Sequence, residues 1–282
     1  MTAIVISITN HKGGTGKTTT TVNLADALAR EGMKVLVVDM DPQSNASTTI
    51  GKDSPYKVKN NVAEMLFGDV SGSSIAAAVH SDNRIPGVDL IYSSIKLASL
   101  DEKLRTKSFN PAKVLDNKLS VFRDHYDYIL IDCPPSLSLL PANALAASDY
   151  YLVPLESGSQ FGLDGIEDLQ DFIGRIKEVN PRLKEVGVVL TKHDGRKTVC
   201  QIMAKIVSER FPNVFKTTIS GSTKISQAIM ARESVIQLDR KSRVSREYVA
   251  LAREIMERTD REPLVPRVPE DELPTADEED SK

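Results

Sequence analysis

The stretch His11-Lys12-Gly13-Gly14-Thr15-Gly16-Lys17-Thr18 follows an apolar run over 4–8 and precedes a helical pattern over 18–30. A glycine-rich loop between a strand and a helix wraps backbone amides around phosphate groups, and the helix adds its positive end. The general pattern asks for Gly, any four residues, then Gly, Lys, and Ser or Thr. Here only the first Gly is replaced, by His11. The stretch therefore predicts a nucleoside triphosphate site, an ordinary glycine turn being the weaker alternative.

Each residue type in this loop predicts a separate contact. The glycines let the backbone approach phosphate oxygens, Lys17 places its ammonium near the β- and γ-phosphates, and Thr18 offers its hydroxyl to Mg²⁺. Lys12 is a second lysine inside the loop. One lysine is enough to hold the phosphates of the chain's own nucleotide, so Lys12 needs a different role.

Three acidic residues follow two apolar runs that are typical of buried strands. Asp39 and Asp41 come after 35–38, and Asp132 comes after 128–131. Ligand groups gather at the carboxyl ends of parallel strands, so we expect Asp132 to hold Mg²⁺ through its water shell. Only one of Asp39 and Asp41 is expected to face the γ-phosphate. We assign Asp41 to positioning water and Asp39 to the metal shell or to a structural role. The alternatives are a structural role for both of these residues and, for Asp132, a carboxylate that caps a turn.

Strands alternate with helical patterns along the chain, which predicts an α/β fold: a doubly wound, mostly parallel sheet with helices on both faces, as in P-loop NTPases. We expect one domain over 1–261 and an acidic, disordered tail over 262–282. Residues 43–60 look irregular. The expected strands are 4–9, 35–38, 88–92, 128–131, 150–153, 186–191 and 214–217. The expected helices are 18–30, 62–67 capped by Asn61, 97–104, 112–125, 163–179, 198–210, 223–231 and 245–258.

The net charge of −3 hides a strong asymmetry along the chain. Residues 262–282 carry eight acidic and two basic residues, whereas 192–261, here called the basic lobe, carry fifteen basic and eight acidic ones. This split predicts a polyanionic partner that is bound through its phosphates without base readout. The alternative is a solvated face of salt bridges, since acidic residues are interleaved. The basic positions considered for this surface are Lys224, Arg232, Arg240, Lys241, Arg243 and Arg246.

Several classes of protein are disfavoured by composition. No apolar run reaches 18 residues and the start of the chain has no signal segment, so we expect a cytoplasmic protein with no membrane partner. Cys133 and Cys200 are far apart, which disfavours a disulfide framework, a zinc site or a cluster scaffold. The four histidines lack metal-ligand spacing.

Three segments together carry a specific resemblance to a known family. They are Lys12-Gly13-Gly14-Thr15-Gly16-Lys17-Thr18-Thr19, Val38-Asp39-Met40-Asp41-Pro42-Gln43-Ser44-Asn45 and Ile131-Asp132-Cys133-Pro134-Pro135-Ser136-Leu137. They resemble the nucleotide motifs of the ParA/Soj partition ATPases, within the deviant Walker A group that includes MinD, and the likeness spans about 2–258. No helix-turn-helix domain precedes the first strand.

The resemblance implies an activity and a site. It implies ATP and Mg²⁺ as cofactors, phosphate contacts along Lys12 to Thr19, and a homodimer joined through ATP, in which Lys12 reaches the partner subunit's nucleotide. Asp41 matches the position associated with hydrolysis. It further implies a slow ATPase that binds nucleoid DNA non-specifically and is stimulated by a ParB-like partner or cargo adaptor. Arg196, Lys224, Lys241 and Arg243 match basic positions in the DNA-contacting region, although Ser220-Gly221 replaces a usual Pro-Arg pair.

Other functions stay open at this point. A MinD-like membrane-cycling regulator would need a basic amphipathic helix at the C-terminus, where this chain is acidic and rich in proline. A metabolic ligase with the same loop would need a substrate pocket. Thr191-Lys192-His193-Asp194 has the Thr-Lys-x-Asp form that reads guanine in some GTPases, so GTP is an alternative to ATP.

Overall fold

The computed structural model describes residues 2–67, 75–99, 104, 106, 110–158 and 165–262. The predicted acidic tail beyond Glu262 lies outside these residues. Seven strands form one sheet in the order β3-β4-β2-β5-β1-β6-β7, parallel except for β3. The strands are β1 (Ile4–Ile8), β2 (Val35–Asp39), β3 (Val79–His80), β4 (Val88–Ile91), β5 (Tyr128–Asp132), β6 (Tyr150–Glu156) and β7 (Lys184–Thr191).

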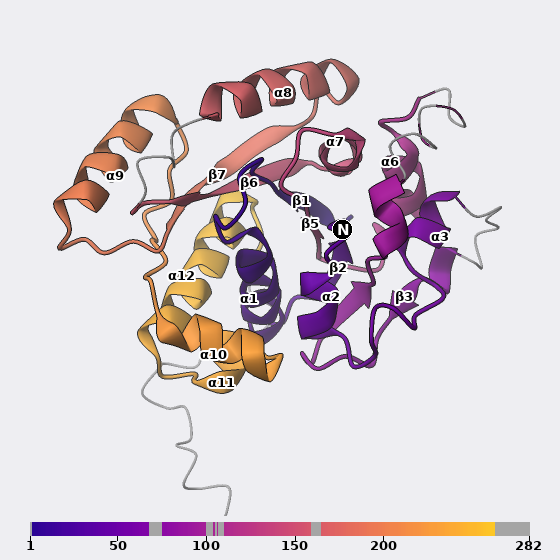
Figure 1. Ribbon diagram of the computed structural model, residues 1–282, viewed down its shortest axis with the longest axis horizontal. Coiled ribbons are helices and arrows are strands. Elements are labelled where there is room, and N and C mark those ends of the chain that lie inside the picture. The colour runs from indigo at the N-terminus through magenta and orange to yellow at the C-terminus, as the bar shows by residue number, and fades with distance from the viewer. Residues whose placement is uncertain are drawn as a thin grey trace, which may run out of the picture.

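Helices cover both faces of this sheet, which confirms the predicted doubly wound α/β fold (Figure 1). On one face lie α1 (Lys17–Arg30), α2 (Asn45–Ile50), α10 (Thr223–Ala231), α11 (Val235–Leu238) and α12 (Arg243–Arg258). On the other lie α3 (Val62–Phe67), α6 (Val114–Leu119), α7 (Leu139–Ala147), α8 (Ile166–Val179) and α9 (Thr198–Arg210), with 3₁₀ turns at Ile95–Ser99 and Ser120–Phe122. Within the described part of the chain, no helix is both long and apolar enough to cross a bilayer.

Two helices, α2 and α7, were not predicted, because neither has the amphipathic sequence pattern that identifies a helix. Residues 43–60 were expected to be irregular, yet α2 forms there, where Asp39 accepts hydrogen bonds from the backbone and hydroxyl of Ser47. Helix α7 was not predicted at all. Eight of its nine residues are buried, so its sequence has no alternation between a polar and an apolar face to read.

Other predicted boundaries needed correction. The strand expected at 214–217 is reduced to a single bridge between Val188 and Val214, because the chain then turns away from the edge of the sheet. The helix expected at 112–125 ends as α6 at Leu119 and continues as a 3₁₀ turn. The helix expected at 97–104 is a 3₁₀ turn over Ile95–Ser99, and most of its remainder lies outside the described residues.

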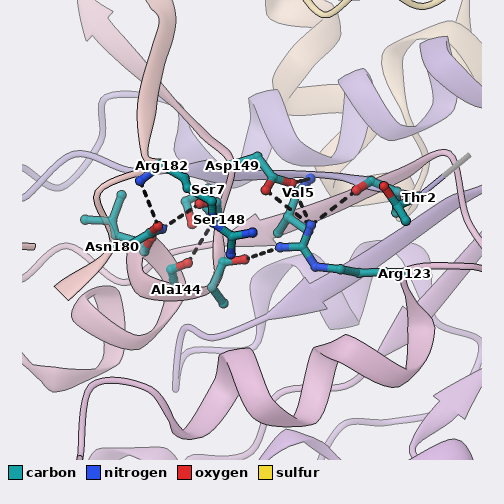
Figure 2. Close-up of polar contacts among 12 residues, drawn as sticks. Thr2, Val5, Ser7, Arg123, Ala144, Ser148, Asp149, Asn180 and Arg182 are labelled. Atoms are coloured by element: carbon teal, nitrogen blue, oxygen red, sulfur yellow. Dashed lines mark hydrogen bonds and ion pairs between the residues drawn. The ribbon is translucent and has the colours of Figure 1, made fainter. Parts of the chain in front are cut away.

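The amino ends of the central strands are held by a polar cluster (Figure 2). Asp149 accepts a hydrogen bond from the backbone of Val5 at 2.9 Å and pairs with Arg123 at 2.9 Å. The Ser7 and Ser148 hydroxyls lie 2.7 Å apart, and Asn180 donates to the carbonyl of Ser148 at 2.7 Å. These contacts tie β1 to the start of β6 and leave the carboxyl ends of the strands free for other groups.

Helix α12 is fastened to the outer strand β7 by Arg258. Its guanidinium donates to the carbonyls of Val186 at 2.8 Å and Val214 at 2.9 Å, and it lies 4.0 Å from the ring centre of Phe215. This is possible only because Gly187 has no side chain. A Cβ at Gly187 would lie 2.5 Å from Arg258 Nη1 and 2.6 Å from the carbonyl oxygen of Asn213.

We predict that Gly187→Ala lowers the free energy of unfolding by about 2 kcal/mol, because overpacking forces Arg258 or its neighbours to move. The matched control is Gly174→Ala in α8, where an added Cβ meets nothing within 4 Å. That change should be neutral or stabilise by about 0.5–1 kcal/mol through helix propensity. Urea denaturation of both variants measures the difference, and equal stabilities would contradict this account of Gly187.

Candidate functional site

The register of the parallel strands brings the predicted site residues to one edge of the sheet. Ile8 of β1 pairs with Asp132 of β5, and Asp39 of β2 pairs with the same Asp132. The glycine-rich loop begins at His11, and only Thr9 and Asn10 separate it from the end of β1. Segments more than 90 residues apart in the sequence therefore meet at the carboxyl ends of three adjacent strands.

The loop itself has the backbone conformation that its glycines predict. Gly14 and Gly16 have φ angles of +77° and +92°, in the left-handed region that favours glycine. Sequence reasoning missed the loop's supports. Asn10 accepts a hydrogen bond from the Lys12 amide and donates to the Pro154 carbonyl at 2.9 Å, and Thr191 at the end of β7 donates to the carbonyl of Thr15 at 2.9 Å.

Lys17 is buried inside the loop, with its ammonium donating to the carbonyl of Lys12 at 2.7 Å. Burial lowers the pKa of Lys17, and the nearby carboxylate of Asp132 opposes this shift. The hydroxyl of Thr15 is also buried, with no hydrogen-bond partner among the described residues. A loop with a buried ammonium, an unpartnered hydroxyl and exposed glycines at 13 and 14 fits bound phosphates.

The predicted metal ligands are already in contact. The hydroxyl of Thr18 donates to Asp132 at 2.8 Å, and that of Thr21 donates to the other carboxylate oxygen at 3.2 Å. Burial raises the pKa of Asp132, and the charge of Asp39 raises it further. Among the described residues no three His, Cys, Asp or Glu side chains form a metal-binding group. The donors thus fit Mg²⁺ that takes its remaining oxygens from phosphates and water.

The structure separates the environments of Asp39 and Asp41. Both oxygens of the fully buried Asp39 accept hydrogen bonds from the protein, from the Asp41 amide at 3.1 Å and from the Ser47 amide and hydroxyl at 2.8 and 2.7 Å. These contacts fit the structural role expected for Asp39, and its place in a metal shell stays a prediction. One oxygen of Asp41 accepts the amide of Gln43 at 2.9 Å, while Ser93 donates to its carbonyl at 2.5 Å.

Lys12 is half-buried in the loop between His11 and the exposed Gly13. The contact of Lys12 with the nucleotide of a partner subunit stays a prediction. His11, which replaces the first glycine of the general pattern, packs against Gly165 at the start of α8. Burial lowers the pKa of His11, and the charge of Lys12 adds to this effect.

The basic lobe is in part a face of salt bridges, as the alternative interpretation expected. Lys224 pairs with Asp239 at 3.2 Å, Arg243 with Glu247 at 2.8 Å, and the exposed Arg196 with Asp194 at 3.0 Å. Eight further cations of the lobe are exposed, and no carboxylate of the described residues forms an ion pair with them. Four of them lie on or beside α10 and α12, namely Arg232, Arg240, Lys241 and Arg246, and the other four are Lys197, Lys205, Arg210 and Lys216.

The Thr191–Asp194 segment, whose sequence resembles a guanine-recognition motif, makes contacts within the protein. Thr191 supports the glycine-rich loop, Lys192 pairs with Glu156 at 3.1 Å, and His193 lies 2.7 Å from the hydroxyl of Ser157. A bridge between His193 and Ser220 brings this segment, and with it Arg196, beside the chain that enters α10. The base of the nucleotide stays a prediction.

Sequence reasoning also missed a cavity of about 710 Å³ next to the Asp41 loop. It touches Ser44, whose amide donates to the Asp41 carbonyl at 2.8 Å. Three lysines and one glutamate line it, together with the exposed side chains of Tyr56 and Ile95. A single-sequence pattern cannot reveal this cavity, because its walls come from four separate segments, around Ser44, Tyr56, Ala78 and Ile95.

Fold and site together define a P-loop nucleotide-binding protein with a second lysine in its phosphate loop. Comparison with known proteins agrees, since a family model described as an AAA domain matches residues 3–185. The chromosome partitioning protein ParA of Caulobacter vibrioides is 36% identical over 258 residues, which cover 90% of this chain and 94% of that protein. The sporulation initiation inhibitor protein Soj of Bacillus subtilis is 36% identical over 253 residues, covering 89% and 97%.

A solved structure is similar over nearly the same length. Cobyrinic acid a,c-diamide synthase from Mycobacterium smegmatis, with a bound ATP analog and magnesium, has a TM-score of 0.78 and 28% identity, covering 92% of this chain and 96% of that one. With these matches, the chain belongs to the ParA/Soj family of P-loop ATPases, which confirms the resemblance seen in its three motifs. Cys133 and Cys200 are buried free thiols, as expected.

We predict that Asp39→Ala lowers the free energy of unfolding by about 2 kcal/mol without nucleotide, because the Ser47 and Asp41 amides lose their acceptor. Asp41→Ala is the matched control, since among the described residues its carboxylate accepts a hydrogen bond only from the Gln43 amide, so the change should cost about 1 kcal/mol or less. Guanidinium denaturation of the nucleotide-free variants measures this ordering. A larger loss for Asp41→Ala would assign the structural role to the wrong carboxylate.

Proposed function

We propose that this protein is a slow, Mg²⁺-dependent ATPase that forms an ATP-joined dimer, binds DNA non-specifically and positions DNA or a protein cargo together with a ParB-like partner. The observation that carries the proposal is a phosphate loop with two lysines, one buried and one beside exposed glycines, in a chain that also carries a basic lobe over 192–261. The family relatives named for chromosome partitioning support it.

The chain's own residues supply the nucleotide contacts in this proposal. The loop amides, Lys17 and Thr19 hold phosphates, while Thr18 and Asp132 hold the Mg²⁺ shell. Mg²⁺ neutralises charge on the phosphates and would relieve the crowding of buried carboxylates at this edge of the sheet. Asp41, whose carboxylate is tied only to a loop amide, orients the water for hydrolysis.

Lys12 is the residue that makes dimerisation depend on ATP in this proposal. Lys17 serves the nucleotide of its own subunit, and a second lysine in the same loop needs a different role. Lys12 reaches the partner's triphosphate, where it neutralises charge that would otherwise repel two nucleotide-bound subunits. Slow intrinsic hydrolysis then keeps the dimer together until a partner acts.

We predict that Lys12→Ala abolishes ATP-dependent dimers while ATP binding persists, and that Asp41→Ala keeps ATP bound and accumulates dimers. Light scattering coupled to gel filtration, with saturating ATP and Mg²⁺, measures both. Lys57→Ala removes a lysine outside the loop and serves as the control that should dimerise as the wild type does. An Asp41→Ala protein that stays monomeric under these conditions would refute the joining role of ATP.

The exposed cations of the basic lobe carry DNA binding in this proposal. The set comprises Arg196, Lys224, Arg240, Lys241, Arg243 and Arg246, on or beside α10 and α12. Three of them already pair with carboxylates, so the unpaired Arg240, Lys241 and Arg246 should contribute most to neutralising DNA phosphates. A dimer doubles this surface, which links ATP binding to retention on the nucleoid.

We predict that Lys241→Glu combined with Arg243→Glu weakens binding to random duplex DNA by about tenfold or more at low salt and reduces the salt dependence, because fewer counterions are released. Nucleotide affinity should not change. Lys57→Glu with Lys59→Glu makes the same change in charge at the cavity near Ser44 and should leave DNA binding within about twofold. Fluorescence anisotropy across a salt series provides the measurement. Equal affinity of wild type and the lobe variant would overturn this surface.

A partner that stimulates hydrolysis could act on Asp41 through the cavity near Ser44. This cavity adjoins the loop that holds the Asp41 carboxylate, so a segment bound there could shift that loop.

A metabolic ligase is the second candidate function, because the solved structure at 28% identity is named as a diamide synthase. ATP-dependent, salt-sensitive DNA binding separates the two, since a ligase has no use for it.

A further inference from the structure

We propose that the acidic segment 263–282 binds the unpaired cations of the chain's own basic lobe and competes there with DNA. This inference deepens the proposed function, on which the DNA part of it rests. The segment would act as a built-in competitor that raises the DNA concentration needed for binding. The argument combines the charge of the lobe, the point at which the segment leaves the fold, and its length.

The lobe presents positive charge that the folded part of the chain does not neutralise. Arg240 and Lys241 lie in the connection that enters α12, and Arg246 lies in its first turn. All three are exposed, and neither they nor Arg232 form an ion pair with any described carboxylate. By contrast, arginines further along α12 are paired, Arg253 with Glu31 and Arg258 with Glu254. Along α12 and the connection that enters it, the cations without an ion pair among the described residues are therefore concentrated at the start of the helix.

The acidic segment begins at the other end of the same helix. Helix α12 has 16 residues, so it is about 24 Å long. Its end is anchored, because Arg261 donates to the carbonyl of Thr2 beside β1. The twenty residues after Glu262 span up to about 66 Å when extended, more than twice the length of the helix. They can therefore run back to the start of α12 with length to spare.

The positions of the acidic residues match that distance. Glu270, Asp271 and Glu272 follow Glu262 by eight to ten residues, which corresponds to about 26–33 Å of extended chain. Asp277, Glu278, Glu279 and Asp280 lie further out and can cross from α12 to Arg232 at the end of α10. Both groups can thus meet cations, while the residues between them carry no charge.

Binding of this kind is weak for each pair and depends on salt. Because the segment is covalently joined to the lobe, its effective concentration there is about millimolar, which free acidic peptides rarely reach. DNA carries a denser array of charge and displaces the segment, but a higher DNA concentration is needed than in its absence. An ATP-joined dimer, with two lobes on one DNA, would bind at a lower DNA concentration than a monomer.

The first test compares two full-length variants with the same change in net charge. Glu278→Gln, Glu279→Gln and Asp280→Asn neutralise the segment. Asp116→Asn, Asp171→Asn and Glu178→Gln neutralise α6 and α8, which cover the opposite face of the sheet from α12 (Figure 1). With ATP at low salt, the segment variant should bind random duplex DNA about fivefold more tightly than wild type, and the difference should vanish at high salt. The control should stay within about twofold. Equal gains for both variants would reduce the effect to overall charge and overturn the proposal.

A second measurement reads the contact without DNA. In the full-length protein labelled with ¹⁵N, the amide signals of residues 270–280 should shift when Lys241→Glu and Arg246→Glu remove the lobe's charge, and added salt should move the wild-type signals in the same direction. Amide signals that ignore both changes would overturn the contact. If the wild type binds no DNA but the signals respond, the proposed function fails while the intramolecular contact stands, so the two failures are distinguishable.

Discussion

The constraint on which this structure depends is the burial of three carboxylates at one edge of a parallel sheet. The register sets Asp39 directly beside Asp132, and Asp41 follows two residues later. Burial raises the pKa of both Asp39 and Asp132; the charge of Asp41 adds to the shift of each, and the charge of Asp39 raises the pKa of Asp132 further. Hydroxyls of Thr18, Thr21 and Ser47, together with backbone amides, offset part of this cost. Such an edge favours the binding of a divalent cation together with the phosphates of a nucleotide.

The same edge is mechanically joined to the basic lobe through α1. This helix begins with Lys17 of the phosphate loop, and its Asn23 and Asp26 accept hydrogen bonds from the Val235 amide and the Ser234 hydroxyl at the start of α11. Arg258 fastens α12 to β7, whose last residue supports the phosphate loop. The phosphate loop and the lobe are thus joined through α1, while the cluster around Asp149 holds the opposite end of the sheet.

Much of the fold could be predicted, because buried parallel strands such as 35–38 and 128–131 are continuous apolar runs, and α1, α8 and α9 carry a clear helical period. The failures have physical causes. Helix α2 consists of residues with weak helix preference and is stabilised by Asp39 from another element. Helix α7 is apolar on all sides, and the strand expected at 214–217 leaves the sheet after one bridge. In each case tertiary contacts, rather than the local sequence pattern, determined the secondary structure.

By itself the sequence determined the phosphate loop, its two lysines, the acidic strand ends and the separation of basic lobe from acidic tail, because these depend only on local order and composition. Only the tertiary structure decided that Asp39 is held through both of its carboxylate oxygens and Asp41 through one, that Asn10 and Thr191 support the loop, and which lobe cations are paired. Those distinctions depend on distances between segments far apart in the chain, and no local pattern records them.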